Sequence, residues 1–435
     1  MIHFIFLMLG FLLMLYQLIN SKTKGKQIPG PKGLPIFGCS FYLSAENTHV
    51  KYAEFAKSYG DICEVQLLKN NVILLNSSDL INAISEDKYK QYLNDRPETF
   101  YGENILFGSQ STAFYKDGYC HTHDNLRKGF ARAVYAFEHG HCSSFDADLK
   151  TLIEDDLAKD IKLHAGTAFE FTSMIQKSLT RVLAFVLTGE ICNDNDDGLV
   201  AIIEYTDMVN IMVNPSINNM LTSFPFLHKI PGPYASYLAT ILRAKHVIVQ
   251  RFFIHQKESY TPGTIRGFVD FYIKQQNEDL ESGKEIFFTD EKIICQILEL
   301  CASVMLTTWG AIVNTFLCLV NHPEYQDKIF EELSNVACYN KSLEYGDKAK
   351  CPTLEAVEME VHRYVTGFPL LLPRSNKHHL MFEGYNLPKD SILVGNVWYI
   401  HHDEKIWGDP WNFRPERWLN GQGFLISSDH VLRKK

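Results

Sequence analysis

One apolar segment constrains the fold more than any other part of the chain. Thr289 is a good N-cap, and Asp290 and Glu291 follow it in the first turn, where the helix dipole favours acidic side chains. The segment continues to Asn321 without a proline, so it predicts a single helix of about 48 Å at 1.5 Å per residue. Because it is apolar on nearly every side, we expect it to be buried across a whole domain.

A membrane span is the alternative interpretation of this helix. Gln296, Glu299 and Asn314 lie within it, and its entry is polar. Placing such groups in lipid is costly, so the sequence favours a helix inside a folded domain.

The N-terminus carries a second apolar run, from Ile2 to Ile19. About 18 apolar residues are just enough to span a bilayer. Lys22, Lys24 and Lys26 follow the run directly, which predicts that the rest of the chain lies on the cytoplasmic side. A cleaved signal peptide is the alternative, but its charges normally precede the apolar run. Residues 1–20 are therefore expected to form an uncleaved membrane anchor.

The next segment, residues 21–38, is basic and then rich in proline and glycine. Three prolines between Ile28 and Gly38 cannot continue a helix and favour a stiff, extended hinge. Residues 39–435 are expected to form one body domain.

The periodicity of this body indicates mainly helix with small sheets, an α+β fold. Ile62 to Leu68 and Val72 to Asn76 are predicted strands joined by a turn at residues 69–71. A helix is predicted to begin at Ser78, and helices should dominate residues 125–340. A second strand-rich region is expected after Pro369.

Composition excludes some functions and suggests a compartment. With 51 acidic and 42 basic residues the net charge is −9, which argues against a nucleic-acid-binding protein. Ten cysteines form no small-domain disulfide pattern, which suggests a reducing environment. We therefore expect the sequon at Asn76 to carry no glycan.

Glu360 and Arg363 form a Glu-x-x-Arg motif. A three-residue step places both side chains on one helical face, where a carboxylate and a guanidinium can pair. The motif alone is unspecific. It gains specificity from Pro415-Glu416-Arg417-Trp418, which follows at the right distance. Together with the anchor, the hinge and the long helix, these motifs resemble the cytochrome P-450 family of heme-thiolate monooxygenases over essentially the whole chain.

Within that family the chain is similar to microsomal enzymes that act on steroids and lipophilic foreign compounds, steroid 17-alpha-hydroxylase among them. The resemblance implies the cytochrome P-450 fold. It also implies that Glu360, Arg363 and Arg417 form a buried structural triad, which is costly to break because an orphaned charge stays desolvated.

The resemblance further implies three contacts to the heme propionates. Arg374 follows Pro373 where the family places a propionate-binding residue, although a surface arginine is the alternative. His123 and Arg127 align with the family's Trp-x-x-x-Arg motif. Histidine replaces the tryptophan and can still donate one hydrogen bond, so a weakened contact is expected.

The long helix aligns Ser303 to Thr307 with the family's oxygen-activating signature. Thr307 is kept as the candidate catalytic residue, but Leu306 replaces the acid and Val304 replaces the glycine. In the family the acid helps to relay protons, which leucine cannot do. The alternative for Thr307 is a mid-helix threonine that bonds back to a preceding carbonyl.

The family's axial ligand is a cysteine thiolate, which promotes oxygen–oxygen bond cleavage. No cysteine follows Cys351, and the chain stops where the cysteine loop would begin. We therefore expect the sequence to be truncated, with no metal ligand in it and no activity in this form.

Three functions follow as hypotheses. The first is a heme monooxygenase of the endoplasmic reticulum membrane, which oxidises a steroid, fatty acid or xenobiotic with electrons from NADPH through a membrane reductase, with a cytochrome b-type donor as a further partner. The second is a non-catalytic, membrane-anchored pseudoenzyme or lipid-binding protein, which Leu306, Val304 and His123 would explain. The predicted pocket-lining segments are residues 105–114, 210–226 and 370–372, which are apolar but not diagnostic of a substrate.

The third hypothesis is a non-heme metal site. Two clusters could offer ligands, although their spacing matches no known zinc module and three basic residues between them disfavour a cation. They comprise Cys120, His121, His123, His139, His141 and Cys142. The histidine pairs His378-His379 and His401-His402 are expected to be polar surface and loop residues.

Overall fold

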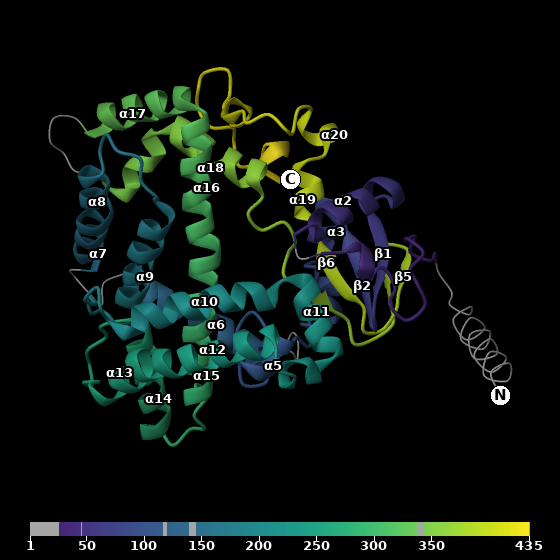
Figure 1. Ribbon diagram of the computed structural model, residues 1–435, viewed down its shortest axis with the longest axis horizontal. Coiled ribbons are helices and arrows are strands. Elements are labelled where there is room, and N and C mark those ends of the chain that lie inside the picture. Colours follow the sequence, from purple (N-terminus) through teal and green to yellow (C-terminus); the bar gives the residue numbers. More distant parts are fainter. Residues whose placement is uncertain (1–25, 45, 116–119, 139–144, 338–342, 435) are drawn as a thin grey trace.

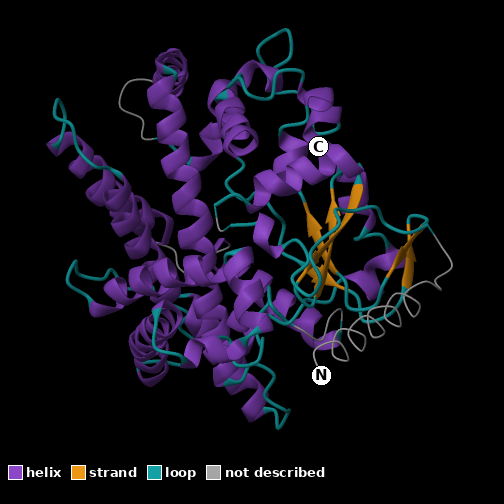
Figure 2. Ribbon diagram, turned by 45° about the vertical axis from the view of Figure 1, so that its right-hand side comes forward, coloured by secondary structure: helices purple, strands orange, loops and turns teal. Residues whose placement is uncertain are grey.

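The computed structural model describes residues 26–44, 46–115, 120–138, 145–337 and 343–434. The predicted anchor, residues 1–20, lies outside the described residues. Most of the described chain is helical, with two small sheets near one side (Figures 1 and 2). The predicted class, mainly α with small β-sheets, is confirmed.

The first half of the chain contributes a set of short helices and a larger set of mostly longer ones. The short set comprises α2 (Thr48–Tyr59), α3 (Ser78–Ala83) and α4 (Asp87–Leu93), which lie next to the sheet, and α5 (Phe100–Asn104), which lies among the helices of the larger set (Figure 1). The larger set comprises α6 (His121–Glu138), α7 (Phe145–Ile153), α8 (Lys159–Leu163), α9 (Thr172–Thr188), α10 (Asp197–Val213), α11 (Pro215–Ser223), α12 (Pro233–Ile248), α13 (His255–Glu258) and α14 (Phe268–Glu281).

The largest hydrophobic core lies within the larger helical set. Leu183, Ile202, Ile241 and Tyr272, each from a different helix, are at most 2% exposed and belong to one cluster. Burying side chains of this size contributes about 1.5–3 kcal/mol each, so this cluster fixes the helices against one another.

The main sheet joins the two ends of the body. Its strands are β1 (Ile62–Leu67), β2 (Asn70–Leu75), β6 (Ile392–Gly395) and β3 (Arg374–Ser375), in that order. The β1–β2 hairpin is antiparallel, whereas β2 and β6 are parallel. A second sheet pairs β4 (Leu380–Phe382) with β5 (Tyr385–Leu387). The predicted hairpin and the predicted strands after Pro369 are thus present.

The hairpin turn is shorter than predicted. Leu67 pairs with Asn70, so only Leu68 and Lys69 form the turn instead of residues 69–71. Leu68 adopts a φ of 52°, the left-handed conformation that a tight two-residue hairpin turn requires. Because no glycine or asparagine occupies this position, the sequence gives little sign of the turn's true centre.

The long helix runs through the middle of the molecule as α15 (Asp290–Ser303), a π-helical segment (Val304–Thr308) and α16 (Trp309–Asn321) (Figure 1). The predicted N-cap is present, because the Thr289 side chain accepts a hydrogen bond from the Lys292 N–H. Among the described helices, this one is long and apolar enough to cross a membrane, and its first half packs inside the protein.

The prediction that the whole helix is buried holds only for α15. In α16, Cys318 is buried, whereas Phe316, Leu317 and Val320 are 41%, 53% and 67% exposed. The physical reason is that α15 lies within the large core, while α16 packs against α9 and α18 (Pro352–Val365) and leaves one side open.

Two further expectations concern polar residues. Asn76 is 3% exposed, and its side chain donates to the Gly60 carbonyl and accepts from Asn396, so this sequon asparagine is a core residue. His378 and His379 are exposed, as expected. The expectation for His401 and His402 was wrong: His401 ends α19 (Val397–His401) and His402 caps it. His402 is 8% exposed, because its ring packs against the carbonyl oxygens of Trp398 and Tyr364, which lie 2.9 and 3.2 Å from its two nitrogens.

Candidate functional site

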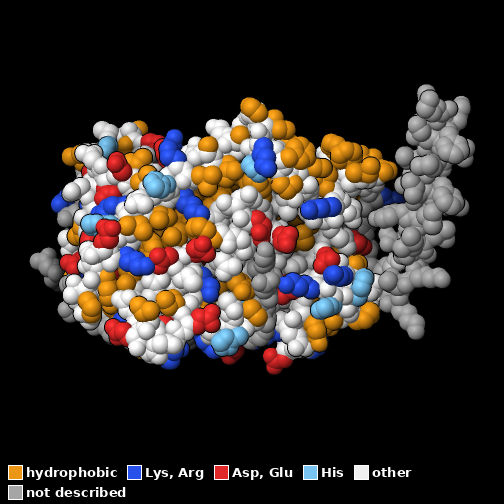
Figure 3. All heavy atoms as spheres, turned by 90° about the horizontal axis from the view of Figure 1, so that it is seen from below, with side chains coloured by type: hydrophobic (Ala, Val, Ile, Leu, Met, Phe, Trp, Pro, Cys, Tyr) orange, Lys and Arg blue, Asp and Glu red, His pale blue; other side chains and the backbone are white. Residues whose placement is uncertain are grey.

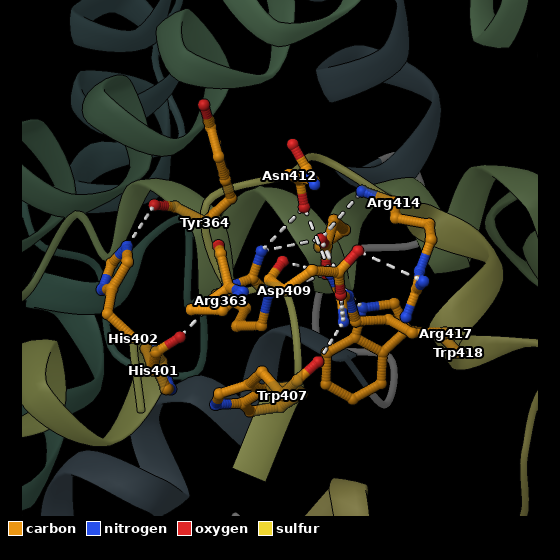
Figure 4. Close-up of polar contacts among 12 residues, drawn as sticks. Arg363, Tyr364, His401, His402, Trp407, Asp409, Asn412, Arg414, Arg417 and Trp418 are labelled. Atoms are coloured by element: carbon orange, nitrogen blue, oxygen red, sulfur yellow. Dashed lines mark hydrogen bonds and ion pairs between the residues drawn. The ribbon is translucent and has the colours of Figure 1, made fainter. Parts of the chain in front are cut away.

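Three predicted residues meet at α18 (Pro352–Val365) and the 3-10 turn Pro415–Trp418. Glu360 and Arg363 lie one turn apart on α18, with Arg363 Nη2 2.8 Å from Glu360 Oε1. Arg417 Nε lies 3.1 Å from the same oxygen. Figure 4 shows Arg363 and Arg417 among their polar partners in this region. The three side chains are at most 3% exposed, so the whole group is buried.

Neutral groups complete the shell around these charges. The Trp418 indole N–H donates to Glu360 Oε2 at 3.0 Å, and Arg363 donates to the carbonyls of His401 and Pro410. Every charged atom therefore has partners, which is the condition for burying an ion pair without loss of stability. This group joins α18 to the 3-10 turn Pro415–Trp418, and its role as a structural triad stays a prediction.

Helix α6 supplies His123 and Arg127, which lie one turn apart. His123 is 6% exposed, and its Nε2 lies 3.0 Å from the Thr112 carbonyl oxygen. Its ring stacks parallel to that of Tyr115 at 6.0 Å. Arg127 is exposed. Because the two residues are four positions apart on α6, both side chains lie on the same face of this helix.

Arg374 reaches this neighbourhood from strand β3. It donates to the side chain of Asn94, and Ser375, its neighbour, donates its backbone N–H to the Asp95 carbonyl. The segment that follows α4 is thereby held against β3.

That same segment brings in a residue that the sequence prediction missed. Arg96 donates to the carbonyls of Leu372 and Pro373 at 3.2 and 2.9 Å, directly before Arg374. The only sign in the sequence is an arginine followed by Pro97 after a short helix. The contact depends on the pairing of residues 95 and 375, which are far apart in the chain.

The electrostatics of this cluster are strongly positive. We call Arg96, Arg127, Arg374 and His123 the cationic cluster. Burial, and then the charge of Arg374, lower the pKa of Arg96 to about 10. Burial and the charge of Arg127 lower the pKa of Arg374. Within the described part of the chain, no carboxylate forms an ion pair with Arg96 or Arg374.

Glu299 on α15 is the acid whose charge acts on this cluster, through Arg96. It accepts a hydrogen bond from the Ala113 N–H at 2.8 Å and acts on Arg96 through its charge. Burial raises the pKa of Glu299 to about 7, so it is only partly ionised near neutral pH. Its charge therefore compensates the cluster only in part near neutral pH.

Thr307 lies in the π-helical segment of the long helix and is exposed. Its Oγ1 donates to the Ser303 carbonyl at 2.6 Å, which is the back-bonded arrangement weighed as the alternative for this residue. π-helical segments occur frequently at functional sites, and this one coincides with the aligned oxygen-activating signature. Leu306 beside it offers no proton.

The cysteines of the long helix are neutral core residues. Burial raises the pKa of both Cys295 and Cys301 to about 12, and Cys295 Sγ donates to the Leu106 carbonyl. Since a metal-ligating cysteine must be a thiolate, neither thiol is suited to hold a metal in this environment. Among the described residues no group of three or more potential metal ligands occurs. His139, His141 and Cys142 of the non-heme hypothesis lie outside the described residues.

Comparison with known proteins identifies the class. Residues 28–432 match the Cytochrome P450 family, and the chain belongs to this family. Its relatives include Cytochrome P450 1A1 of Cavia porcellus, 27% identical over 427 residues, covering 94% of this chain and 79% of the relative. Cytochrome P450 1A2 of Mesocricetus auratus is 26% identical over 422 residues (94% and 78%), and Cytochrome P450 1A1 of Homo sapiens 24% over 426 residues (94% and 80%).

Membership of the family defines the cofactor and the class of reaction. These enzymes are heme-dependent monooxygenases that act on lipophilic substrates and receive electrons from NAD(P)H through a reductase. The described residues fit such a cofactor. Heme carries two propionate carboxylates, and the cationic cluster offers guanidinium groups that form no ion pair with any carboxylate in the described part of the chain. It also contains two buried nitrogens without a hydrogen-bond partner among the described residues, Arg96 Nε and His123 Nδ1.

Proposed function

We propose that the cationic cluster holds the propionates of heme and that the chain is the body of a membrane-bound monooxygenase. The single observation that carries this proposal is the group of buried and half-buried cations that form no ion pair with a carboxylate among the described residues. Guanidinium groups bind carboxylates with charge-assisted hydrogen bonds, often two at a time. A cofactor with two carboxylates would balance the charge that the protein leaves uncompensated.

In this proposal the cluster's residues have distinct tasks. Arg96 and Arg374 would bind and orient the propionates from the β3 side, and Arg127 and His123 would do so from α6. When bound, heme activates molecular oxygen, so that one oxygen atom enters the substrate and the other leaves as water. Thr307 would supply a hydroxyl from the π-helical segment. We assign no residue of this chain as the iron ligand.

The substrate is proposed to be a lipophilic small molecule such as a steroid, a fatty acid or a xenobiotic. An apolar cleft of about 580 Å³ supports this proposal, because a volume of that order suits such a molecule. The cleft is lined from one side by residues 215–227 and from the other by Phe37, Phe41 and Leu67. Of the three predicted lining segments, only residues 210–226 contribute to it.

The membrane is the proposed location of the chain, with residues 1–20 as a single-pass anchor in the endoplasmic reticulum, residues 21–38 as a hinge and residues 39–435 as the cytoplasmic catalytic body. Exposed apolar side chains beside the cleft support this orientation, namely Ile36, Phe41, Phe226 and Ile230, which are 83%, 68%, 56% and 50% exposed. Figure 3 shows hydrophobic side chains gathered along one edge of the molecule. The proposed redox partners are a membrane NADPH-dependent reductase and a cytochrome b-type donor.

A heme titration tests the proposal. Replacing Arg96 or Arg374 by methionine should weaken heme binding by about tenfold to a hundredfold, because each lost charge-assisted hydrogen bond is worth about 1.5–3 kcal/mol. Arg243→Met is the matched control, since Arg243 pairs with Glu204 on the surface, where it is 66% exposed. Circular dichroism verifies that each variant is folded. Equal affinities for all four proteins would refute the proposal.

A non-catalytic role is the second candidate function, and one observation favours it. Leu306 cannot relay protons, and the Thr307 hydroxyl is already bonded to the Ser303 carbonyl. Product formation by the heme-loaded protein with a reductase decides between the two functions. Robust hydroxylation would eliminate the non-catalytic role, whereas tight heme binding without product would support it.

A further inference from the structure

We propose that His123 takes up one proton from solvent when a propionate binds, so that the site holds its carboxylate ligand more tightly as the pH falls. This inference rests on the proposed function. It goes beyond that function because it concerns the protonation state in which the cluster binds, not only the residues that bind.

The first step is the tautomer of the free protein. His123 Nε2 lies 3.0 Å from the Thr112 carbonyl oxygen, and a carbonyl can only accept. Nε2 therefore carries the hydrogen. In a neutral imidazole the other nitrogen, Nδ1, then has a lone pair and no hydrogen.

The second step concerns that other nitrogen. His123 Nδ1 is buried and has no hydrogen-bond partner among the described residues. The ring cannot turn freely to relieve this, because it is 6% exposed, stacks on Tyr115 and is held at Nε2 by Thr112. Among the described residues Nδ1 is therefore a buried polar atom without a donor, which is unfavourable until a partner arrives.

The third step is the charge around the ring. The charged groups that act on it are Arg127 from its own helix, Arg96 from the segment after α4 and Arg374 from β3. Burial and these three cations lower the pKa of His123, so the free ring is neutral at pH 7. Glu299 on α15 is the acid that acts on the cluster through Arg96, and it also titrates near neutral pH.

The fourth step is the chemistry of binding. A carboxylate has only acceptor oxygens, so it repels the lone pair of Nδ1. A proton on Nδ1 turns this repulsion into a charge-assisted hydrogen bond, and the carboxylate in turn stabilises the imidazolium. A tryptophan at this position carries a permanent N–H and needs no proton. The histidine at position 123 therefore makes the contact dependent on pH.

The sign of the effect follows from linkage. Binding raises the pKa of His123 from its depressed free value, so one proton is taken up at any pH between the free and the bound pKa. Over that interval affinity weakens as the pH rises, by up to tenfold per pH unit for one proton. Below the free pKa the ring is already charged and affinity no longer changes.

Metal-free protoporphyrin IX is the probe, because its binding reports on the propionate contacts without any iron ligand. The full chain is titrated by porphyrin fluorescence between about pH 5 and pH 8, the range in which histidine side chains titrate. We expect the wild type to lose affinity with a slope approaching one proton. His123→Trp should bind with an affinity that varies little with pH, and His123→Phe should bind weakly at every pH.

Three controls separate the possible sources of the proton. His121→Gln removes an exposed histidine of the same helix and should keep the wild-type slope. The dimethyl ester of the porphyrin has no carboxylates and should show no slope. Glu299→Gln should keep the slope if His123 takes up the proton.

The outcomes distinguish this inference from the proposed function. Porphyrin binding with a flat pH profile in the wild type overturns the inference alone. The same holds if the slope persists in His123→Trp and disappears in Glu299→Gln. Failure of the wild type to bind the porphyrin at any pH, while remaining folded, overturns the proposed function itself.

Discussion

Arg363 donates two hydrogen bonds to Glu360, with Nε 2.9 Å from Oε2 and Nη2 2.8 Å from Oε1, and both side chains are at most 1% exposed. The two residues are three positions apart on α18, so the helix itself aligns the planar guanidinium with the planar carboxylate. Arg417 and Trp418 add donors to the same carboxylate from a distant segment. The pair is therefore a joint between α18 and the 3-10 turn Pro415–Trp418.

Breaking this joint should destabilise the protein strongly. Arg363→Met leaves Glu360 with one fewer cation in a buried site, and removing one partner of such a pair typically costs about 3–5 kcal/mol. Urea denaturation measures the change in the free energy of unfolding. Arg243→Met, which removes a surface ion pair, should cost no more than about 1 kcal/mol. Equal losses in both variants would contradict a structural role for Arg363.

Much of the fold could be predicted because the relevant signals are local. The Thr289 N-cap, the β1–β2 hairpin and the spacing of Glu360 and Arg363 each depend on residues within a few positions of one another. Periodicity indicated helices for the middle of the chain, and strong amphipathic patterns identify helices well. The exposed side of α16 could not be predicted, because the sequence of an apolar helix does not show which of its faces other helices pack against.

The cationic cluster was predicted only in part for a similar reason. His123, Arg127 and Arg374 belong to aligned motifs, whereas Arg96 belongs to none. Arg96 joins the cluster because residues 95 and 375 pair, and such a long-range pairing has no local signature. His401 and His402 also show this limit: adjacent histidines look polar, yet their surroundings bury one ring and partly bury the other.

Glu299 should make stability depend on pH. Its pKa is about 7 in the folded protein against 4.5 in an unfolded reference, so the native state keeps a proton that the unfolded chain has released. Stability therefore falls as the pH rises from about 4.5 to 7 and stays level above that. Glu299→Gln should be more stable than the wild type at pH 8, by on the order of 1–3 kcal/mol, and nearly equal to it at pH 5. Thermal unfolding at both pH values checks this, and a difference that does not change with pH would contradict it.

His401 should make the stability of the protein depend on pH in the acidic range. Burial, and then nearby His402 and Arg363, lower the pKa of His401 from 6.5 to about 4. The folded ring stays neutral while the unfolded ring gains a proton, so stability falls as the pH drops from about 6.5 towards 4. Asparagine can replace the Nδ1 donor, which lies 3.0 Å from Thr366 Oγ1. Between pH 7 and pH 4.5 the free energy of unfolding of His401→Asn should thus fall by about 1–3 kcal/mol less than that of the wild type.

The measurement for His401 is urea denaturation at the two pH values. His378→Asn is the matched control, because His378 is exposed and its replacement should leave the acid-induced loss as it is in the wild type. A His401→Asn variant that loses as much stability as the wild type would show that other groups govern acid unfolding.

The exposed apolar side chains beside the cleft should contact lipid. Segments 34–42 and 224–230 contain Ile36 and Phe226, which are 83% and 56% exposed. Burying an apolar side chain of this size in a bilayer gains about 1.5–3 kcal/mol, so these segments should sit in the membrane surface. Phospholipid vesicles should therefore slow amide hydrogen exchange in both segments of the full chain severalfold.

The region around Leu280, which is also apolar and 66% exposed but lies at the end of α14, should be unaffected. Phe226→Asp should reduce the protection of residues 224–230 without changing that of the anchor region. Equal protection around Leu280 would indicate non-specific adsorption to the vesicles and contradict a defined lipid-facing surface.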